Sequence, residues 1–285
     1  MFYSPLRYPG GKTKLAKTLE SVFVTNNLMN GTYVEPYAGG AGVALHLLLT
    51  GKASNIIIND ADPVVYAFWH TLLNDYSAFI EKIKDCEITV DNWYHQKEIL
   101  NNHLLNNIDD VGFATFFLNR TNVSGVLKGG CIGGYKQKGK YKINARFNKS
   151  DLISRLELIG LQSSRIQLYN LDAIDLLDQI QPNLPQKSLV YLDPPYYYKG
   201  VTLYRNYYEH DDHVLIANRI KELETPWVVT YDNVEPIRKL YNDQNSVEFF
   251  LTYSANKARI KGSEIMIYNN LIFPRHETLN LITVE

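Results

Sequence analysis

The chain has 285 residues, of which 45% are hydrophobic and 21% are charged, and its formal net charge is -1. These values are ordinary for a folded globular protein and exclude disordered and fibrous classes. A chain of this length can bury one α/β core together with a smaller inserted or appended region.

The sequence carries no signal for export, membrane insertion or metal binding. Residues 1–7 lack a charged start followed by an apolar run, and no apolar stretch approaches the ~20 residues that span a bilayer. The two cysteines, Cys86 and Cys131, have no partner Cys or His at metal-ligand spacing, so we expect buried thiols. A cytoplasmic protein with no membrane and no metal partner is therefore expected.

The first predicted elements alternate between strand and helix. Residues 32–35 favour a short strand, 36–42 a glycine-rich turn and 43–49 a helix. Residues 56–58 favour a second buried strand, which ends on Asn59-Asp60. This alternation is typical of a parallel sheet.

The alternation is interrupted and then resumes. Asp62-Pro63 predicts the start of a helix, with proline at the first helical position, but residues 74–160 are first polar and helical and then basic and glycine-rich. Strands are predicted again at 166–169, 189–192 and 227–231. The sequence thus predicts three segments, 1–73, 74–160 and 161–285, of which the middle one is an insertion.

Acidic residues follow four of the predicted strands: Glu35, Asp60, Asp172 and Asp193. Ligands of open α/β sheets bind at the carboxyl ends of the strands, so we expect these acids to border one cleft. Asp60 lies 25 residues after Glu35, similar to the ~20-residue spacing at which dinucleotide-binding folds place an acid on the ribose hydroxyls. An adenosine moiety in the ligand is therefore predicted.

Gly10-Gly11-Lys12-Thr13 is similar to part of a phosphate-binding loop, but that motif requires glycine where Leu6 stands and a preceding strand. Nucleotide hydrolysis is rejected on this ground. Lys12 and the two glycines still offer a cation and backbone N–H groups to a carboxylate or another anion.

A basic stretch lies within the predicted insertion. Residues 111–150 contain no Asp or Glu, although they contain eight basic residues: Arg120, Lys128, Lys136, Lys138, Lys140, Lys142, Arg146 and Lys149. Such a distribution favours a surface that faces a polyanion over a merely solvated face.

Asp193-Pro194-Pro195-Tyr196 is the candidate catalytic motif. Two successive prolines donate no hydrogen bond, so they end the strand, stiffen the loop and aim the Pro194 carbonyl outward. This carbonyl and the Asp193 carboxylate can accept the two N–H groups of an exocyclic amine, whose lone pair then attacks a methyl group in line. The Tyr196 ring offers a stacking face to a base removed from a duplex.

Five motifs, in this order, resemble those of the Dam-type DNA adenine-N(6) methyltransferases of bacteria and phages, and the resemblance covers nearly the whole chain. They are Arg7-Tyr8-Pro9-Gly10-Gly11-Lys12, Val34-Glu35-Pro36-Tyr37-Ala38-Gly39-Gly40, Asn59-Asp60, Phe117-Leu118-Asn119-Arg120-Thr121 and Asp193-Pro194-Pro195-Tyr196. The resemblance implies an α/β fold with a Rossmann-like S-adenosylmethionine-dependent methyltransferase sheet. Residues 74–160 are then an inserted, largely helical and loop-rich target-recognition domain. The implied activity is site-specific methylation of the adenine amino nitrogen in double-stranded DNA, by base flipping and direct in-line transfer.

The resemblance also implies site residues. Those expected to bind S-adenosylmethionine are Tyr8, Gly10, Gly11 and Lys12 from the N-terminal side, Glu35, Pro36, Tyr37, Ala38 and Gly39 at the methionine end, Asp60 at the ribose, Asp172 near the adenine, and Asp193. The catalytic residues are Asp193, Pro194, Pro195 and Tyr196. The expected DNA-binding residues are Arg120, Asn122, Ser124, Lys128, Lys136, Lys138, Lys140, Lys142 and Arg146.

Some features depart from the family or leave alternatives open. Residues 122–130 and the lysines after them differ from the recognition hairpin of the GATC-methylating members, so that target sequence is not carried over. A methyltransferase of the same fold that acts on RNA or on a protein amide is one alternative, and an inactive DNA-binding protein is another. Whether a separate restriction endonuclease is a partner is also open.

Two clusters follow the catalytic motif. Six tyrosines, Tyr196, Tyr197, Tyr198, Tyr204, Tyr207 and Tyr208, lie close together in sequence, and we expect one or two of them to face the substrate. His210-Asp211-Asp212-His213 is interpreted as an acidic helix start and not as a metal site.

Overall fold

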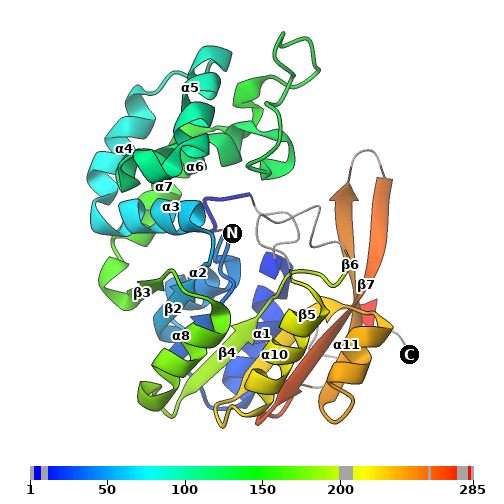
Figure 1. Cartoon of the computed structure of the whole chain (residues 1–285). Coiled ribbons are helices and arrows are strands. Elements are labelled where there is room, and N and C mark those ends of the chain that lie inside the picture. Colours follow the sequence, from blue (N-terminus) through cyan, green and yellow to red (C-terminus); the bar gives the residue numbers. More distant parts are fainter. Residues whose placement is uncertain (1–2, 8–11, 199–207, 256–257, 275–281, 284–285) are drawn as a thin grey trace.

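A mixed eight-stranded sheet forms the centre of the protein (Figure 1). The computed structural model describes residues 3–7, 12–198, 208–255, 258–274 and 282–283. The strand order is β3-β2-β1-β4-β5-β7-β6-β8. The strands are β1 (Gly31–Glu35), β2 (Ala53–Asn59), β3 (Ile166–Tyr169), β4 (Ser188–Leu192), β5 (Trp227–Asp232), β6 (Asn245–Ala255), β7 (Ala258–Asn269) and β8 (Ile282–Thr283).

The first five strands pair in parallel, and β7 pairs antiparallel with both β5 and β6. The α-helices are α1 (Ala16–Thr25), α2 (Gly42–Leu49), α3 (Pro63–Asn74), α4 (Tyr76–Asp85), α5 (Val90–Asn101), α6 (Ile108–Thr121), α7 (Lys149–Gly160), α8 (Ala173–Ile180), α10 (His210–Lys221) and α11 (Glu235–Leu240). Short 3-10 turns are η1 (Lys12–Leu15), η2 (His103–Leu105), η3 (Val123–Gly125), η4 (Ile143–Arg146), η5 (Ser163–Arg165) and η6 (Gln181–Asn183).

Both faces of the parallel part of the sheet are covered by helices. Side chains alternate along a strand, so Tyr33 packs in the cluster that contains α1 and α2, whereas the next residue, Val34, packs in the cluster that contains α8 and α10. All five residues of β1 and of β4 are buried. This two-sided burial explains why residues 189–192 of β4 are all apolar and do not alternate with polar residues.

The structure confirms the strands and helices predicted from the apolar runs and the glycine turn. Asp62 caps α3 by accepting a hydrogen bond from the Val64 amide, and Pro63 is the first residue of that helix, as predicted. Together with the strand order, these elements confirm the α/β, Rossmann-like fold class.

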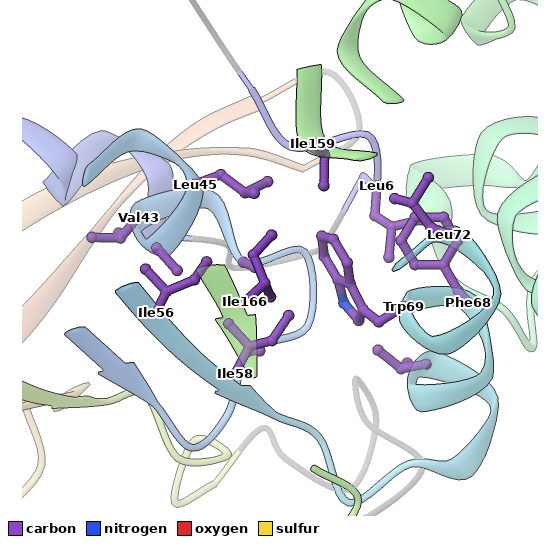
Figure 2. Packing of buried hydrophobic residues seen from close by; sticks show 14 of the residues in the cluster. Leu6, Val43, Leu45, Ile56, Ile58, Phe68, Trp69, Leu72, Ile159 and Ile166 are labelled. Atoms are coloured by element: carbon purple, nitrogen blue, oxygen red, sulfur yellow. The ribbon is translucent and has the colours of Figure 1, made fainter. Parts of the chain in front are cut away.

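Residues 74–160 form α4 to α7 and the loops between them, and pack beyond α3 (Figure 1). One core continues from the sheet into these helices, because Phe68 of α3 stacks on Phe116 of α6 and meets Phe79 of α4 edge to face. Figure 2 shows the adjoining part of this core, where Trp69 lies between the helices and the strands. The boundaries of a separate recognition domain stay a prediction.

Within the described part of the chain, no helix combines the length and apolar character required to traverse a bilayer.

Candidate active site

A cavity of about 340 Å³ opens at the carboxyl ends of the parallel strands. Its wall includes Glu35 after β1, Asp60 after β2, Asp172 before α8, and Asp193 after β4. The structure thus brings together the four acids that the sequence places at strand ends. The other predicted cofactor residues on this wall are Lys12, Pro36, Tyr37, Ala38 and Gly39. Tyr8, Gly10 and Gly11 lie outside the described residues.

The glycine turn is held against the neighbouring strand and helix. Gly39 and Ala41 adopt positive φ angles of 46° and 47°, which lets the chain reverse between β1 and α2. The Gly39 amide donates to Asp60 Oδ2 over 2.9 Å, and the Gly39 carbonyl accepts from Trp69 Nε1 over 2.9 Å. The Asp62 amide donates to Asp60 Oδ1 over 2.9 Å, so both oxygens of this carboxylate are held in place.

Asn59 joins two loops that border the cavity. Its side chain is fully buried, and its Nδ2 donates to the carbonyls of Pro36, over 2.9 Å, and of Leu171, over 3.0 Å. Its Oδ1 accepts from the Leu171 amide over 2.9 Å. The ends of β1, β2 and β3 are therefore tied together by one amide group, just before Asp172.

Two acids of the cavity, Glu35 and Asp60, have raised pKa values. Burial raises the pKa of Glu35 to about 8; the Ala44 amide, which donates to Glu35 Oε2 over 3.1 Å, opposes this rise, and Asp193 adds to it. Burial also raises the pKa of Asp60 to about 7. A ligand that brings positive charge or hydrogen-bond donors to this wall is favoured, because it stabilises the ionised carboxylates.

Asp193 lies at the centre of a polar network. Its Oδ1 accepts from Lys12 Nζ over 2.8 Å and from Thr230 Oγ1 over 2.9 Å. In the described residues no donor contacts Oδ2, and none contacts the Pro194 carbonyl. These two oxygens are the acceptors that an exocyclic amine requires.

Tyr196 is only 6% exposed and does not border the cavity. Its hydroxyl donates to Glu264 Oε1 over 2.8 Å and accepts from Lys12 Nζ over 3.2 Å. Lys12 Nζ also lies 4.8 Å from the centroid of the Tyr196 ring and so covers part of one ring face.

Sequence analysis missed Glu264, a buried acid on β7. Its Oε2 lies 3.5 Å from Lys12 Nζ, and burial followed by the effect of Lys12 and Asp193 leaves its pKa raised to about 7. Burial lowers the pKa of Lys12, but Asp193 and Glu264 outweigh it and raise the pKa overall, so Lys12 is a cation. No motif marks Glu264, which stands in an ordinary strand sequence about seventy residues from Asp193.

The tyrosines after the catalytic motif divide into separate groups. Tyr208 lines the cavity, and its hydroxyl lies 2.8 Å from that of Tyr37. The Tyr197 amide donates to Asp232 Oδ1 over 3.0 Å, which fixes the loop to β5, whereas Tyr198 is exposed. Tyr204 and Tyr207 lie outside the described residues.

The N-terminal segment, residues 3–7, runs between the cavity and the predicted recognition region. Ser4 Oγ donates to the Gly40 carbonyl over 2.5 Å, so the segment contacts the glycine turn. The Arg7 amide donates to Asn119 Oδ1 over 2.7 Å, and Asn119 Nδ2 returns a bond to the Arg7 carbonyl over 2.9 Å. Gly125 packs so closely here that a Cβ would lie 2.2 Å from the Arg7 carbonyl oxygen.

Most of the predicted DNA-binding residues are exposed on the loop between α6 and α7. They are Ser124, Lys128, Lys136, Lys138, Lys140, Lys142 and Arg146. The aromatic side chains of Tyr94 and Tyr135 stack beside this loop, with centroids 5.8 Å apart, and both are more than half exposed.

One of the predicted DNA contacts, Asn122, needs correction, and a second, Arg120, is less exposed than the others. Asn122 is fully buried: its Oδ1 accepts from Trp93 Nε1 over 2.6 Å, and its Nδ2 donates to the carbonyls of Val126 and Leu127. It organises the start of the loop and offers no atom to a groove. Arg120 is partly buried and donates from Nε to the Arg146 carbonyl over 2.8 Å; its contact with DNA stays a prediction.

The segment His210-Asp211-Asp212-His213 begins α10, as expected. Glu209 and Asp212 form a reciprocal capping box, with the Glu209 amide donating to Asp212 Oδ2 over 2.8 Å. Across the residues the structure describes, no group of three or more His, Cys, Asp or Glu side chains could hold a metal ion.

Comparison with known proteins decides the family. The family model of the D12 class N6 adenine-specific DNA methyltransferases matches residues 8–254. The chain belongs to this family. The methyltransferase is thus an adenine-specific DNA-modifying enzyme, which decides against the inactive DNA-binding alternative and against RNA or protein as the family's substrate.

Two curated relatives are type II methyltransferases. M.MjaIII of Methanocaldococcus jannaschii is 26% identical over 239 residues, which is 77% of this chain and 79% of the relative. M.CviBI of Paramecium bursaria Chlorella virus NC1A is 22% identical over 253 residues, 87% of this chain and 90% of the relative. Among solved structures, the rRNA methyltransferase AviRa of Streptomyces viridochromogenes aligns with a TM-score of 0.39 at 12% identity, over 92% of this chain and 85% of its own.

Proposed function

We propose that the methyltransferase transfers a methyl group from S-adenosylmethionine directly to the amino nitrogen of an adenine flipped out of double-stranded DNA. One observation carries this proposal: among the described residues, no donor contacts Asp193 Oδ2 or the Pro194 carbonyl, and Asp193 lines a cavity walled by acids. Hydrogen bonds to these acceptors would orient the amine and make its lone pair available.

The cavity suits S-adenosylmethionine in size and charge. Its volume of about 340 Å³ falls in the range of small-molecule sites, and the raised pKa values of Glu35 and Asp60 favour a ligand with positive charge and donors. Glu35 would hold the ammonium group, Asp60 the ribose hydroxyls, and Asp172 would lie near the adenine. Bound S-adenosylmethionine supplies the electrophilic methyl group.

In the proposed mechanism Asp193 accepts one amine N–H at Oδ2, because its Oδ1 is engaged by Lys12 and Thr230. The Pro194 carbonyl accepts the other N–H. Tyr196 would stack on the base once DNA binding uncovers its ring, which is 6% exposed in this structure and has Lys12 over part of one face. The surplus proton leaves to solvent after attack, so no covalent enzyme intermediate is required.

The exposed loop lysines between α6 and α7 would bind phosphates and hold the duplex over the cavity. In this proposal residues 74–160 read the target sequence, and the methyltransferase requires no metal. A cognate restriction endonuclease, acting separately, would fit the type II naming of the relatives.

The test is methylation of mixed-sequence plasmid DNA with labelled S-adenosylmethionine, followed by nucleoside analysis and mapping of modified positions. We expect N6-methyladenine within one short motif, and no turnover by an Asp193→Ala protein that keeps its fold. Turnover by Asp193→Ala, or label on another atom of the DNA, would refute the mechanism. Label on RNA alone would refute the substrate.

A further inference from the structure

Two acids on neighbouring strands, Asp232 and Glu264, hold two consecutive residues of the catalytic loop, Tyr197 and Tyr196. Glu264 of β7 pairs in register with Asp232 of β5. Asp232 Oδ1 accepts from the Tyr197 amide over 3.0 Å, and Glu264 Oε1 accepts from the Tyr196 hydroxyl over 2.8 Å. The loop is therefore anchored through its backbone at one residue and through a side chain at the preceding one.

The bonds around the Tyr196 hydroxyl have a fixed direction. A phenol carries one proton, and Lys12 is a cation that can only donate. Lys12 Nζ therefore donates to the phenol oxygen over 3.2 Å, and the phenol proton goes to Glu264. A donor on one side and an acceptor on the other fix the position of the phenol oxygen, and with it the direction in which the long axis of the ring points.

Burying the Glu264 carboxylate lowers the stability of the fold. The Glu264 side chain is 2% exposed, and a buried charge requires compensation that a well-packed apolar side chain does not need. Lys12 already has Asp193 as a counterion at 2.8 Å, so Glu264 is not required to neutralise it. Glu264 also lies beyond the residues 8–254 matched by the family model.

We propose that Glu264 is a positioning residue for methyl transfer, which holds the Tyr196 ring at the angle needed to stack on the target adenine. This inference rests on the stacking role proposed for Tyr196. Glu264 touches neither cofactor nor base, and acts through the Tyr196 hydroxyl.

The test compares four proteins with the wild type in steady-state DNA methylation: Glu264→Leu, Glu264→Gln, Tyr196→Phe, and the double variant Tyr196→Phe/Glu264→Leu. We expect Glu264→Leu and Tyr196→Phe each to lower kcat about tenfold, because each removes the same hydrogen bond to a charged group. Glu264→Gln, which keeps an acceptor oxygen for the phenol, should stay within about threefold of wild type. The two reductions should not multiply in the double variant, since both changes remove the bond between Tyr196 and Glu264; each also removes one contact of Lys12.

Controls separate positioning from stability. Glu264→Leu should keep the wild-type circular dichroism spectrum at the assay temperature, although it leaves the buried Tyr196 hydroxyl without its acceptor, and the KM for S-adenosylmethionine should stay within about threefold. Glu248→Leu serves as the matched variant, because Glu248 lies on the neighbouring strand β6 and, among the described residues, its side chain pairs with the surface residue Arg238 over 2.7 Å; its kcat should equal wild type.

Three results would overturn the proposal: wild-type kcat in Glu264→Leu, wild-type kcat in Tyr196→Phe, or reductions that multiply in the double variant. Tyr196→Phe leaves position 264 untouched, so it decides the question even if Glu264→Leu does not fold. Tyr196→Ala tests the underlying mechanism separately. Wild-type kcat in Tyr196→Ala would remove the stacking role itself, whereas a slow Tyr196→Ala beside a fast Tyr196→Phe would remove only the role of Glu264.

Discussion

Replacing Asn59 with alanine should loosen the cavity and destabilise the fold together. The Asn59 side chain is fully buried and makes three hydrogen bonds, two as donor and one as acceptor, to the backbone of Pro36 and Leu171. Each bond contributes about 1 kcal/mol net, and the backbone groups left without a partner add a desolvation cost. We therefore expect Asn59→Ala to lower the free energy of unfolding by about 3–5 kcal/mol.

The assay is urea denaturation followed by circular dichroism, with Asn55→Ala as the control. Asn55 lies on the same strand but is exposed and bonds only to Ser54 Oγ over 3.1 Å, so its replacement should cost less than about 0.5 kcal/mol. S-adenosylmethionine titration should also show weaker binding to Asn59→Ala, because both loops that it ties border the cavity. Equal unfolding free energies for the two variants would refute this reasoning.

Three other predictions concern charge and backbone geometry. The pKa of Glu35 is raised from 4.5 to about 8, so the protonated form stabilises the fold and this contribution is lost as the pH rises through about 8. The melting temperature of the ligand-free protein should therefore fall as the pH rises from about 5 to about 9, and less steeply in Glu35→Gln; equal slopes would contradict the prediction. Replacing Lys136, Lys138 and Lys140 with glutamine should weaken DNA binding and reduce its salt dependence, by up to about three in the slope of log affinity against log salt. As a control, Lys187→Gln, at the amino end of β4, should change neither the DNA affinity nor its salt dependence. An unaltered salt dependence in the triple variant would exclude these three lysines from the DNA surface. Gly125→Ala should cost several kcal/mol more than Gly134→Ala, because both glycines have positive φ but only at Gly125 would the added Cβ meet the Arg7 backbone; thermal unfolding measures this difference, and equal melting temperatures would contradict it.

The parallel half of the sheet could be predicted because its elements carry local signals. Strands β1 and β4 are buried along their whole length, and the acids Glu35 and Asp193 mark where they end. The position of Asp193 beside Glu35 followed from the rule that parallel strands end at one edge. The antiparallel strands β6 and β7 were not predicted, because no glycine turn or acid marks their ends in the way that it does for the parallel strands. Their place in the sheet is fixed by the pairing of β7 with β5 and β6.

Residues of the active site could be predicted only where they belong to a sequence motif. Trp69 holds the glycine turn and Glu264 holds Tyr196, yet both stand in ordinary helix or strand sequence, so their roles arise from tertiary packing. Asn122 shows the opposite error. A polar residue in a basic loop was expected to face DNA, but the loop needs a buried amide to satisfy its own carbonyls.

The way in which residues 4–7 are held has a consequence for engineering. This segment bonds to Gly40 on the cavity side, and to Asn119 on the other side through both its amide and carbonyl groups. A chimera that imports residues 74–160 from a relative would place foreign side chains against this strip and disturb the cofactor wall as well. If residues 74–160 read the target sequence, as proposed, exchange of target specificity would require residues 4–7 to be exchanged with them, although about seventy residues separate the two segments.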